Sequence, residues 1–298
     1  MGEAVSMTRP EELAPIQRKK FERYCEILRR EKSREKTDFW DVVVLTAADD
    51  EQARAYREQV RWRQELGQIP ASCAYHVVPD PPGCKIGNGG ATLVVLDHLR
   101  AQFKELFPTL KCLVIHAGGY SQRTPQHSVC GKIFAPLPVG PLPGSSMLEM
   151  CFAMLCDIPS RVAPGTIMIK CGDDVIIFDA EECQWDRAGF TALAHRSTVD
   201  IAFTHGVFCL DLPDSTDSSD FPTNPPCRRF THKPSLDKMR RFRALLNQEQ
   251  EAFTDSTFLF DASVAARLLS WWDKECKGAP PPFELDAYGD MLQVSRKR

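Results

Sequence analysis

The feature that most constrains this chain is a short apolar run that ends in a pair of glycines. Residues 112–116 read Cys-Leu-Val-Ile-His, with the length and branched content of a buried parallel strand. Gly118 and Gly119 follow. A residue without a Cβ lets the backbone approach a ligand closely and adopt dihedral angles that other residues avoid. The pattern predicts a strand that enters a tight glycine turn.

Polar and basic residues come next along the chain, namely Ser121, Gln122, Arg123 and, after a short gap, Lys132. Amide groups in a tight turn form a concavity that binds anions. Arginine can grip phosphate oxygens with two hydrogen bonds, and lysine adds a point charge. These residues are typical of a phosphate site. A plain turn with solvated basic residues is the other interpretation, because a Gly-Gly pair alone is a weak signal.

Composition limits the classes of protein to consider. The chain has 298 residues, of which 43% are hydrophobic and 26% charged, and no apolar run approaches the length of a membrane span. The net charge of −3 gives no sign of a nucleic-acid binder. An anionic ligand would therefore be held by local basic groups.

The twelve cysteines are scattered through the predicted strands and helices, without CxxC pairs at zinc spacing. The first residues do not read as a secretory signal. We therefore expect reduced, mostly buried thiols in a cytoplasmic protein that does not enter the membrane.

The order of elements predicts an α/β fold with a mixed, mostly parallel sheet flanked by helices. Residues 1–37 are expected to form a polar tail and a helix with a narrow apolar stripe, and residues 38–298 a single α/β domain. Strands are expected near 40–45, 75–78, 112–116, 164–170, 189–194, 199–210, 228–234 and 254–260, and helices near 50–66, 91–106, 147–156, 235–246 and 261–272.

A second glycine-rich loop, residues 79–90, precedes a predicted helix. Gly89 and Gly90 at the head of that helix would suit the approach of an anion or a flat base to backbone amides. In open α/β sheets, ligands bind at the carboxyl ends of strands, where both glycine loops fall. From the residues alone, a plain connection remains the favoured interpretation.

The strand near 164–170 ends in Cys-Gly-Asp-Asp, with the acids at Asp173 and Asp174. Adjacent carboxylates beside an apolar run are costly to bury unless a cation neutralises them. Mg²⁺ takes one or two carboxylates together with ligand phosphates, so this pair could hold it opposite the glycine turn. For the motif in isolation, a turn-forming aspartate is the favoured alternative.

Several stretches together resemble the sugar-1-phosphate nucleotidyltransferases, and within them the fucose-1-phosphate guanylyltransferase family. They span most of the chain in order, at residues 39–41 (FWD), 85–90 (KIGNGG), 116–123 (HAGGYSQR), 131–134 (GKIF), 189–195 (GFTALAH), 204–208 (THGVF), 232–235 (HKPS) and 286–290 (DAYGD). The resemblance implies a Rossmann-like fold of the nucleotide-diphospho-sugar transferase type. Family members continue beyond the last motif into β-helical repeats, so we expect a truncated form that lacks this region.

The resemblance also implies site residues. Arg123, Lys132 and Asp173 would be catalytic, and the nucleotide would meet Lys85, Gly87, Asn88, Gly89, Gly90, Gly118, Gly119, Tyr120, Ser121 and Gln122. The sugar phosphate would meet Lys233, with His205 and His232 nearby, although a histidine in an apolar strand is more often a core residue. In the wider superfamily an acidic residue precedes the Lys-Pro pair. In this chain His232 stands at that position, which agrees with the motif of the fucose-specific family.

The implied cofactor is Mg²⁺, held first by Asp173. Asp174 is the second choice, because neighbours on an extended segment face opposite ways. Asp286 and Asp290, far along the chain, are candidates for completing the metal site or for binding sugar hydroxyls.

The implied reaction joins GTP and β-L-fucose 1-phosphate to give GDP-L-fucose and pyrophosphate, in fucose salvage. Two alternatives stay open: a form that binds nucleotide with little or no turnover, and a metal-dependent glycosyltransferase. The second would consume a nucleotide sugar and release no pyrophosphate.

Overall fold

The computed structural model describes residues 10–33, 35, 37–119, 124–138, 145–185, 188–211, 225–277, 279–280 and 283–291. Its helices are α1 (Pro10–Lys32), α2 (Asp50–Glu65), α3 (Gly87–Phe103), α4 (Gln126–Cys130), α5 (Met147–Leu155), α6 (Val199–Ala202), α7 (Leu236–Arg241) and α8 (Ala262–Glu275), with the 3-10 helices η1 (Lys104–Thr109) and η2 (Lys132–Phe134) and the π-helical turn η3 (Ala287–Met291). The strands are β1 (Val42–Ala47), β2 (Ala74–Pro79), β3 (Cys112–His116), β4 (Ile167–Cys171), β5 (Phe190–Thr198), β6 (Gly206–Leu210), β7 (Cys227–His232), β8 (Leu245–Leu246) and β9 (Glu251–Phe260).

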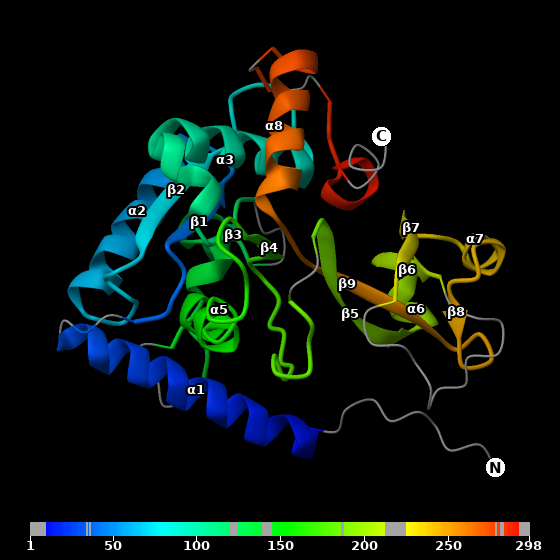
Figure 1. Ribbon diagram of the computed structural model, residues 1–298, viewed down its shortest axis with the longest axis horizontal. Helices are drawn as coiled ribbons and strands as arrows, with labels where there is room; N and C mark the ends of the chain where they lie inside the picture. The colour runs from blue at the N-terminus through cyan, green and yellow to red at the C-terminus, as the bar shows by residue number, and fades with distance from the viewer. Residues whose placement is uncertain are drawn as a thin grey trace.

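The described strands form one nine-stranded sheet in the order β2-β1-β3-β4-β9-β6-β7, with β5 and β8 also paired to β9 (Figure 1). Strands β2, β1, β3 and β4 are parallel, and β9 is antiparallel to β4. The predicted mixed α/β sheet with flanking helices is confirmed. Its parallel half carries both glycine loops, and its other half is an antiparallel extension.

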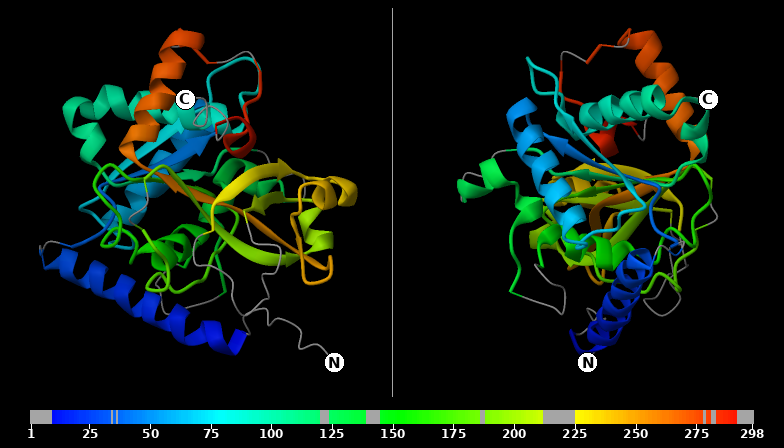
Figure 2. Two further views of the ribbon diagram at one scale, coloured as in Figure 1. Left: turned by 45° about the vertical axis from the view of Figure 1, so that its right-hand side comes forward. Right: turned by 90° about the vertical axis from the view of Figure 1, so that its left-hand side faces the viewer.

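The alternation along β1 explains why helices cover both faces of the sheet. Val43 and Leu45 belong to the apolar cluster beneath α1, α2 and α5, whereas Val42 and Val44 belong to the cluster beneath α3 and α8. The right-hand view of Figure 2 shows the sheet between these helices. A strand buried on both faces reads as a continuous hydrophobic run, as this one does.

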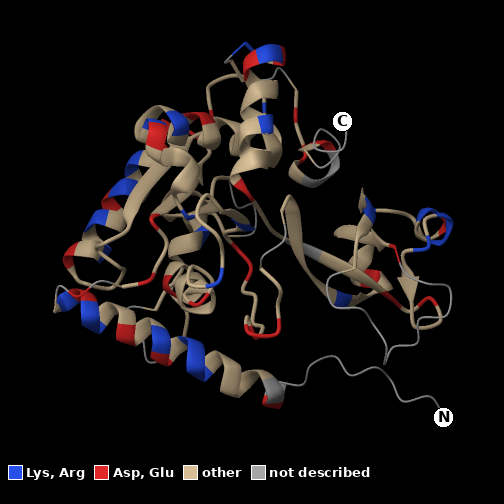
Figure 3. Cartoon of the chain, viewed as in Figure 1, with Lys and Arg blue, Asp and Glu red and all other residues tan. Residues whose placement is uncertain are grey.

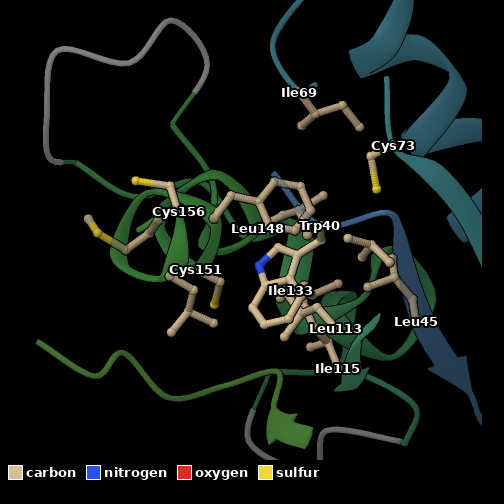
Figure 4. Close-up of a cluster of buried hydrophobic side chains, with 14 of the residues drawn as sticks. Trp40, Leu45, Ile69, Cys73, Leu113, Ile115, Ile133, Leu148, Cys151 and Cys156 are labelled. Carbon is tan, nitrogen blue, oxygen red and sulfur yellow. The ribbon is translucent and has the colours of Figure 1, made fainter. Parts of the chain in front are cut away.

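Burial of Ile133 fixes the backbone beside one of the predicted catalytic residues. This side chain is fully buried with Leu113, Ile115 and Leu148 in the cluster shown in Figure 4. Full burial of an isoleucine side chain stabilises a fold by roughly 1.5–3 kcal/mol. Lys132, the preceding residue, is thereby anchored to the core through its neighbour.

Helix α1 covers the core more closely than the sequence predicted. Phe21 is buried, and Tyr24 is fully buried. Lys20 reaches across to Asp157, with 2.7 Å between Nζ and Oδ1, and both residues are buried. A buried charge needs such a partner, so the helix is tied to the domain electrostatically as well as by packing.

Strand β9 joins the two halves of the sheet. Phe258 pairs with β5 and with Ile169 of β4, and Thr254 pairs with β5 and with Val207 of β6. Because β5 occupies one edge of β9 throughout, β4 and β6 share the other edge, end to end. Phe258 and Thr254 lie roughly 13 Å apart along an extended strand, so the carboxyl end of β4 meets the start of β6.

Three sequence predictions were wrong in detail. Helix α3 begins at Gly87 and not at Ala91, because contacts with residues 285–287 support its glycine-rich first turn. Residues 199–202 form the helical turn α6 and not a strand, since the Val199 amide bonds to the Gln250 carbonyl and the chain leaves the ladder. The predicted basic helix 235–246 ends at Arg241 and is followed by β8.

Candidate active site

The loops that follow β1, β3 and β4 converge so closely that they leave no room for side chains. A Cβ on Gly118 would lie 2.7 Å from the Ala47 carbonyl carbon. A Cβ on Gly172 would lie 3.1 Å from the Cα of Ala117, and the Gly172 amide donates to the His116 carbonyl at 3.0 Å. The carboxyl ends of these strands thus form one edge, the usual ligand-binding edge of an open α/β sheet.

At this edge the lysine after the glycine turn meets the acid after β4. Lys132 Nζ lies 2.9 Å from Asp173 Oδ2, and the two side chains are 42% and 56% exposed. An exposed ion pair of this kind contributes only about 0.2–1 kcal/mol. A phosphate group or a metal ion could therefore displace either partner at little cost in stability.

Asp174 faces elsewhere. The ammonium group of Lys170, whose side chain is 1% exposed, donates to the Asp174 carboxylate and, at 3.1 Å, to the Asp174 carbonyl. Its charge is thus already balanced by a buried lysine, which disfavours the predicted metal contact of Asp174. Asp173 is the acid that remains open at the sheet edge.

The edge fits a cation that takes few protein ligands. Among the described residues, no group of three or more His, Cys, Asp and Glu side chains is placed to hold a metal ion. Asp173 supplies one exposed carboxylate. Mg²⁺ is commonly bound by one or two carboxylates plus substrate phosphates. Asp173 fits this mode of binding. The described residues do not fit a metal site in which every ligand comes from the protein.

The three residues predicted to hold the sugar phosphate lie together. His232 is paired with Gly206 across β6 and β7, and the Lys233 amide donates to the His205 carbonyl at 2.9 Å. Because β6 starts where β4 ends, this end of the hairpin faces the carboxyl ends of β4 and β3. Figure 1 shows β6 and β7 on one side and β3 and β4 on the other, with β9 linking them.

The local geometry of this hairpin end is unusual. Lys233 has a φ of 42°, in the left-handed region that few non-glycine residues adopt. The imidazole of His205 contacts the Ile201 carbonyl through Nδ1 at 2.9 Å. Burial, together with the nearby His205, lowers the pKa of His195 below its ordinary value. His195, the last residue of the 189–195 motif, thus lies near His205.

The amides of the first glycine turn already have partners. Gly118 donates to Thr46 Oγ1 at 3.4 Å, and Gly119 donates to Gln52 Oε1 at 3.3 Å. Both bonds are longer than the usual 2.9–3.0 Å, so a phosphate oxygen could compete for these donors. The remaining predicted residues of the turn, Tyr120, Ser121, Gln122 and Arg123, lie outside the described residues, and their roles stay predictions.

In the second glycine loop, the backbone that approaches closely belongs to the protein itself. A Cβ on Gly87 would lie 2.5 Å from the Leu285 carbonyl oxygen, and one on Gly89 would lie 2.9 Å from the same atom. The Gly89 amide donates to that oxygen at 2.9 Å, and the Ala287 amide donates to Asn88 Oδ1 at 2.9 Å. The glycines therefore have a packing role that the sequence did not reveal.

The nucleotide contacts predicted for Lys85 and Gly90 stay predictions. Lys85 is exposed within the loop. Gly90 is buried, and a Cβ there would lie 2.7 Å from the Cβ of Ile86, so this glycine also serves local packing. Asp290 is occupied with its own segment, since its Oδ2 accepts from the Asp286 amide at 2.9 Å. In the described part of the chain, no contact joins Asp290 to Asp173.

Sequence reasoning missed a polar stripe on α2. Its members Gln52, Tyr56 and Gln59 stand at helical spacing and donate to main-chain carbonyls on either side of the glycine turn, at Ala117, Gly119, Ser128 and Cys130. Uncharged polar residues at this spacing in an otherwise strongly charged helix were the available signal. By contrast, the basic residues of α7 lie beyond β7, on the side away from β3 and β4 (Figure 3), and Arg240 there pairs with Glu249 at 2.7 Å.

Within the described residues, no helix is both long and apolar enough to cross a bilayer. The twelve cysteines form no disulfide bond, and five of them are buried, fewer than the sequence predicted.

Comparison with known proteins identifies relatives over most of the chain. The fucose-1-phosphate guanylyltransferase of Mus musculus is 40% identical over 86% of this chain and 46% of its own length. The protein of the same name from Homo sapiens is 38% identical over 93% of this chain and 48% of its own. The bifunctional fucokinase/GDP-fucose pyrophosphorylase of Arabidopsis thaliana is 29% identical over 86% of this chain and 26% of its own.

The chain thus spans about half the length of the two guanylyltransferases it matches. The comparison with solved structures gives no match. Residues 104–297, which include the glycine turn, Asp173 and the β6–β7 hairpin, match the fucose pyrophosphorylase domain. The chain belongs to the fucose pyrophosphorylase domain family.

Proposed function

We propose that this chain transfers a guanylyl group from GTP to β-L-fucose 1-phosphate, forming GDP-L-fucose and pyrophosphate in fucose salvage. The names of the two guanylyltransferase relatives support the substrates. The observation that carries the proposal is the meeting of Lys132 and Asp173 at the sheet edge, opposite the hairpin that bears Lys233.

In this reaction an oxygen of the fucose 1-phosphate attacks the α-phosphorus of GTP in line. One P–O bond forms to the α-phosphorus, and the bond between the α-phosphorus and the oxygen that bridges it to the β-phosphate breaks. Pyrophosphate leaves and carries the negative charge that develops on that oxygen. The attacking phosphate is already ionised at neutral pH, so no strong general base is needed. The protein must bring two anions together and stabilise the charge on the leaving group.

The basic residues are divided between the two substrates. Lys132 and Arg123 hold the triphosphate on the side of the glycine turn, and Lys233 holds the sugar phosphate from the hairpin. His205 and His232 flank Lys233 and are placed to contact the sugar or its phosphate. The guanosine is held at the second glycine loop, with Lys85 as the charged group there.

Mg²⁺ is the proposed cofactor, and Asp173 is the residue that would hold it. When bound, the ion neutralises phosphate oxygens and so favours departure of pyrophosphate. Asp173 would give up its contact with Lys132 in order to hold the ion, and Lys132 would then be available to contact phosphate. The free cysteines support the proposed cytoplasmic location, where thiols stay reduced.

The test is pyrophosphate release from GTP or UTP, each with fucose 1-phosphate and Mg²⁺. We expect release with GTP and much less with UTP. Thermal stabilisation by GTP and Mg²⁺ without pyrophosphate release would replace the proposal with a nucleotide-binding role. Turnover of a nucleotide sugar without pyrophosphate would indicate a glycosyltransferase instead.

A further inference from the structure

One stripe of α2 contacts residues 117–119 and 128–131, which lie on either side of Arg123 in the sequence and are called the substrate-binding segment. Its members Gln52, Tyr56 and Gln59 lie at the spacing of successive helical turns. Their polar atoms donate to the main-chain carbonyls of residues 117, 119, 128 and 130. None of these side chains was assigned a role by the sequence.

Gln52 makes hydrogen bonds through both ends of its amide group and is only 4% exposed. Its Oε1 accepts from the Ala48 amide at 2.8 Å and from the Gly119 amide at 3.3 Å. Its Nε2 donates to the Gly119 carbonyl at 3.2 Å and to the Ser128 carbonyl at 2.8 Å. One buried side chain therefore joins the turn after β1, the glycine turn after β3 and helix α4.

Tyr56 and Gln59 continue the contact toward Lys132. The Tyr56 hydroxyl donates to the Ala117 carbonyl at 2.9 Å, and Gln59 Nε2 donates to the Cys130 carbonyl at 2.6 Å. The Tyr56 ring also lies against Gly131, where an added Cβ would come within 2.5 Å of Cε1. The residue directly before Lys132 is thus pressed onto the same helix face.

We propose that this stripe is a template that positions the substrate-binding segment, with Gln52 as its principal positioning residue. The proposal rests on the nucleotidyl transfer proposed above. Loops held only by their own backbone sample many conformations, whereas the helix is rigid and packed on the sheet. Gln52 fixes the glycine turn, and Tyr56 with Gln59 fixes the approach to Lys132, so that its ammonium group stays beside Asp173.

Substitutions at Gln52 separate positioning from packing. Gln52→Met has nearly the same length but loses all four hydrogen bonds. Gln52→Glu keeps an acceptor for the two amides and loses the donors to the two carbonyls. Two variants on the same helix serve as controls: Arg54→Gln on the exposed face and Val60→Ala in the core.

Two measurements are made on each variant of the full chain. One is kcat and KM for pyrophosphate release from GTP and fucose 1-phosphate. The other is amide hydrogen exchange over residues 124–134, which needs no turnover, together with the melting temperature. A displacement of about 1 Å in a reacting group can cost about 100-fold in rate. We expect Gln52→Met to lower kcat by roughly 10- to 100-fold, with a much smaller change in KM.

In the same variant, exchange over residues 124–134 should accelerate, and Gln52→Glu should fall between it and the parent. Val60→Ala should lower the melting temperature and leave exchange in this segment unchanged. If the parent releases no pyrophosphate, the proposed function fails, while the exchange data still test the template. The template proposal would be overturned if Gln52→Met showed the amide exchange and the kcat of the parent. It would also be overturned if Val60→Ala accelerated exchange over residues 124–134 as much as Gln52→Met does.

Discussion

Lys132 and Asp173 come from different loops of the sheet edge, and their charged atoms lie 2.9 Å apart. The lysine follows the glycine turn after β3, and the aspartate follows β4. Both side chains are open to solvent, so the contact can be exchanged for contacts with phosphate and a metal ion. We therefore expect this ion pair to matter more for ligand binding than for the stability of the fold.

Lys132→Met and Asp173→Asn should each lower pyrophosphate release by roughly 100- to 1,000-fold, because each removes charge stabilisation at the reacting phosphates. The melting temperature should barely change, since an exposed ion pair contributes little. Steady-state kinetics and thermal unfolding check the two halves of this prediction. Asp174→Asn is the neighbouring comparison, and an equal loss of activity there would contradict the distinction drawn between the two acids.

Gly131→Ala should destabilise the protein by roughly 1–3 kcal/mol and reduce activity further than stability alone explains. Gly131 has a φ of 82°, and a Cβ would lie 2.5 Å from the Tyr56 ring. Gly83→Ala provides the control, because Gly83 also has a positive φ of 123° but meets no atom within 4 Å. Chemical denaturation measures both, and equal effects of the two substitutions would show that the ring contact is unimportant.

Asn88→Ala should loosen the segment of residues 283–291, because it removes the acceptor of the Ala287 amide. A hydrogen bond of this kind contributes about 1 kcal/mol. Amide exchange of residues 283–291 should accelerate in this variant and not in Lys85→Ala, which alters an exposed residue of the same loop. Unchanged exchange in Asn88→Ala would mean that the segment is held by other contacts.

Stability should fall as the pH drops from 6.5 toward 4, in part because of His116. Burial lowers the pKa of this histidine from 6.5 to about 4, and its Nε2 lies 3.0 Å from Thr92 Oγ1. Between these values the unfolded chain binds a proton that the folded chain does not, so the contribution is complete above pH 6.5 and is lost on acidification.

We expect His116 to contribute on the order of 2 kcal/mol to the free energy of unfolding above pH 6.5. The contribution is kept below the full effect of the pKa shift because His116 is only partly buried. Denaturation of the parent and of His116→Gln across this range measures it by difference. The variant should show a flatter dependence on pH. Identical slopes in the two proteins would refute the assignment to His116.

The parallel half of the fold was predictable because its strands are buried on both faces and therefore read as unbroken apolar runs. The run of residues 112–116 became β3 with the same bounds. The alternation of neighbours on an extended chain also indicated that Asp173 and Asp174 point in different directions. The structure agrees, with the first beside Lys132 and the second bonded to Lys170.

The rest depended on contacts between segments far apart in the sequence. Gly87 and Gly89 were predicted to approach a nucleotide, and the structure shows in addition that the backbone of Leu285 lies against both. Local propensity cannot show which distant segment fills such a space. In the same way, α6 interrupts a run that had the residues of a strand, because the ladder with β9 ends at Thr198.

The central claim is that the β3 and β4 loops and the β6–β7 hairpin form one site for two phosphorylated substrates. Its most direct test is pyrophosphate release from GTP and fucose 1-phosphate by the parent, Lys132→Met and Lys233→Met. The account predicts release by the parent, with Lys132→Met impaired mainly toward GTP and Lys233→Met mainly toward fucose 1-phosphate. Release by both variants at the rate of the parent, with unchanged KM for both substrates, would contradict it.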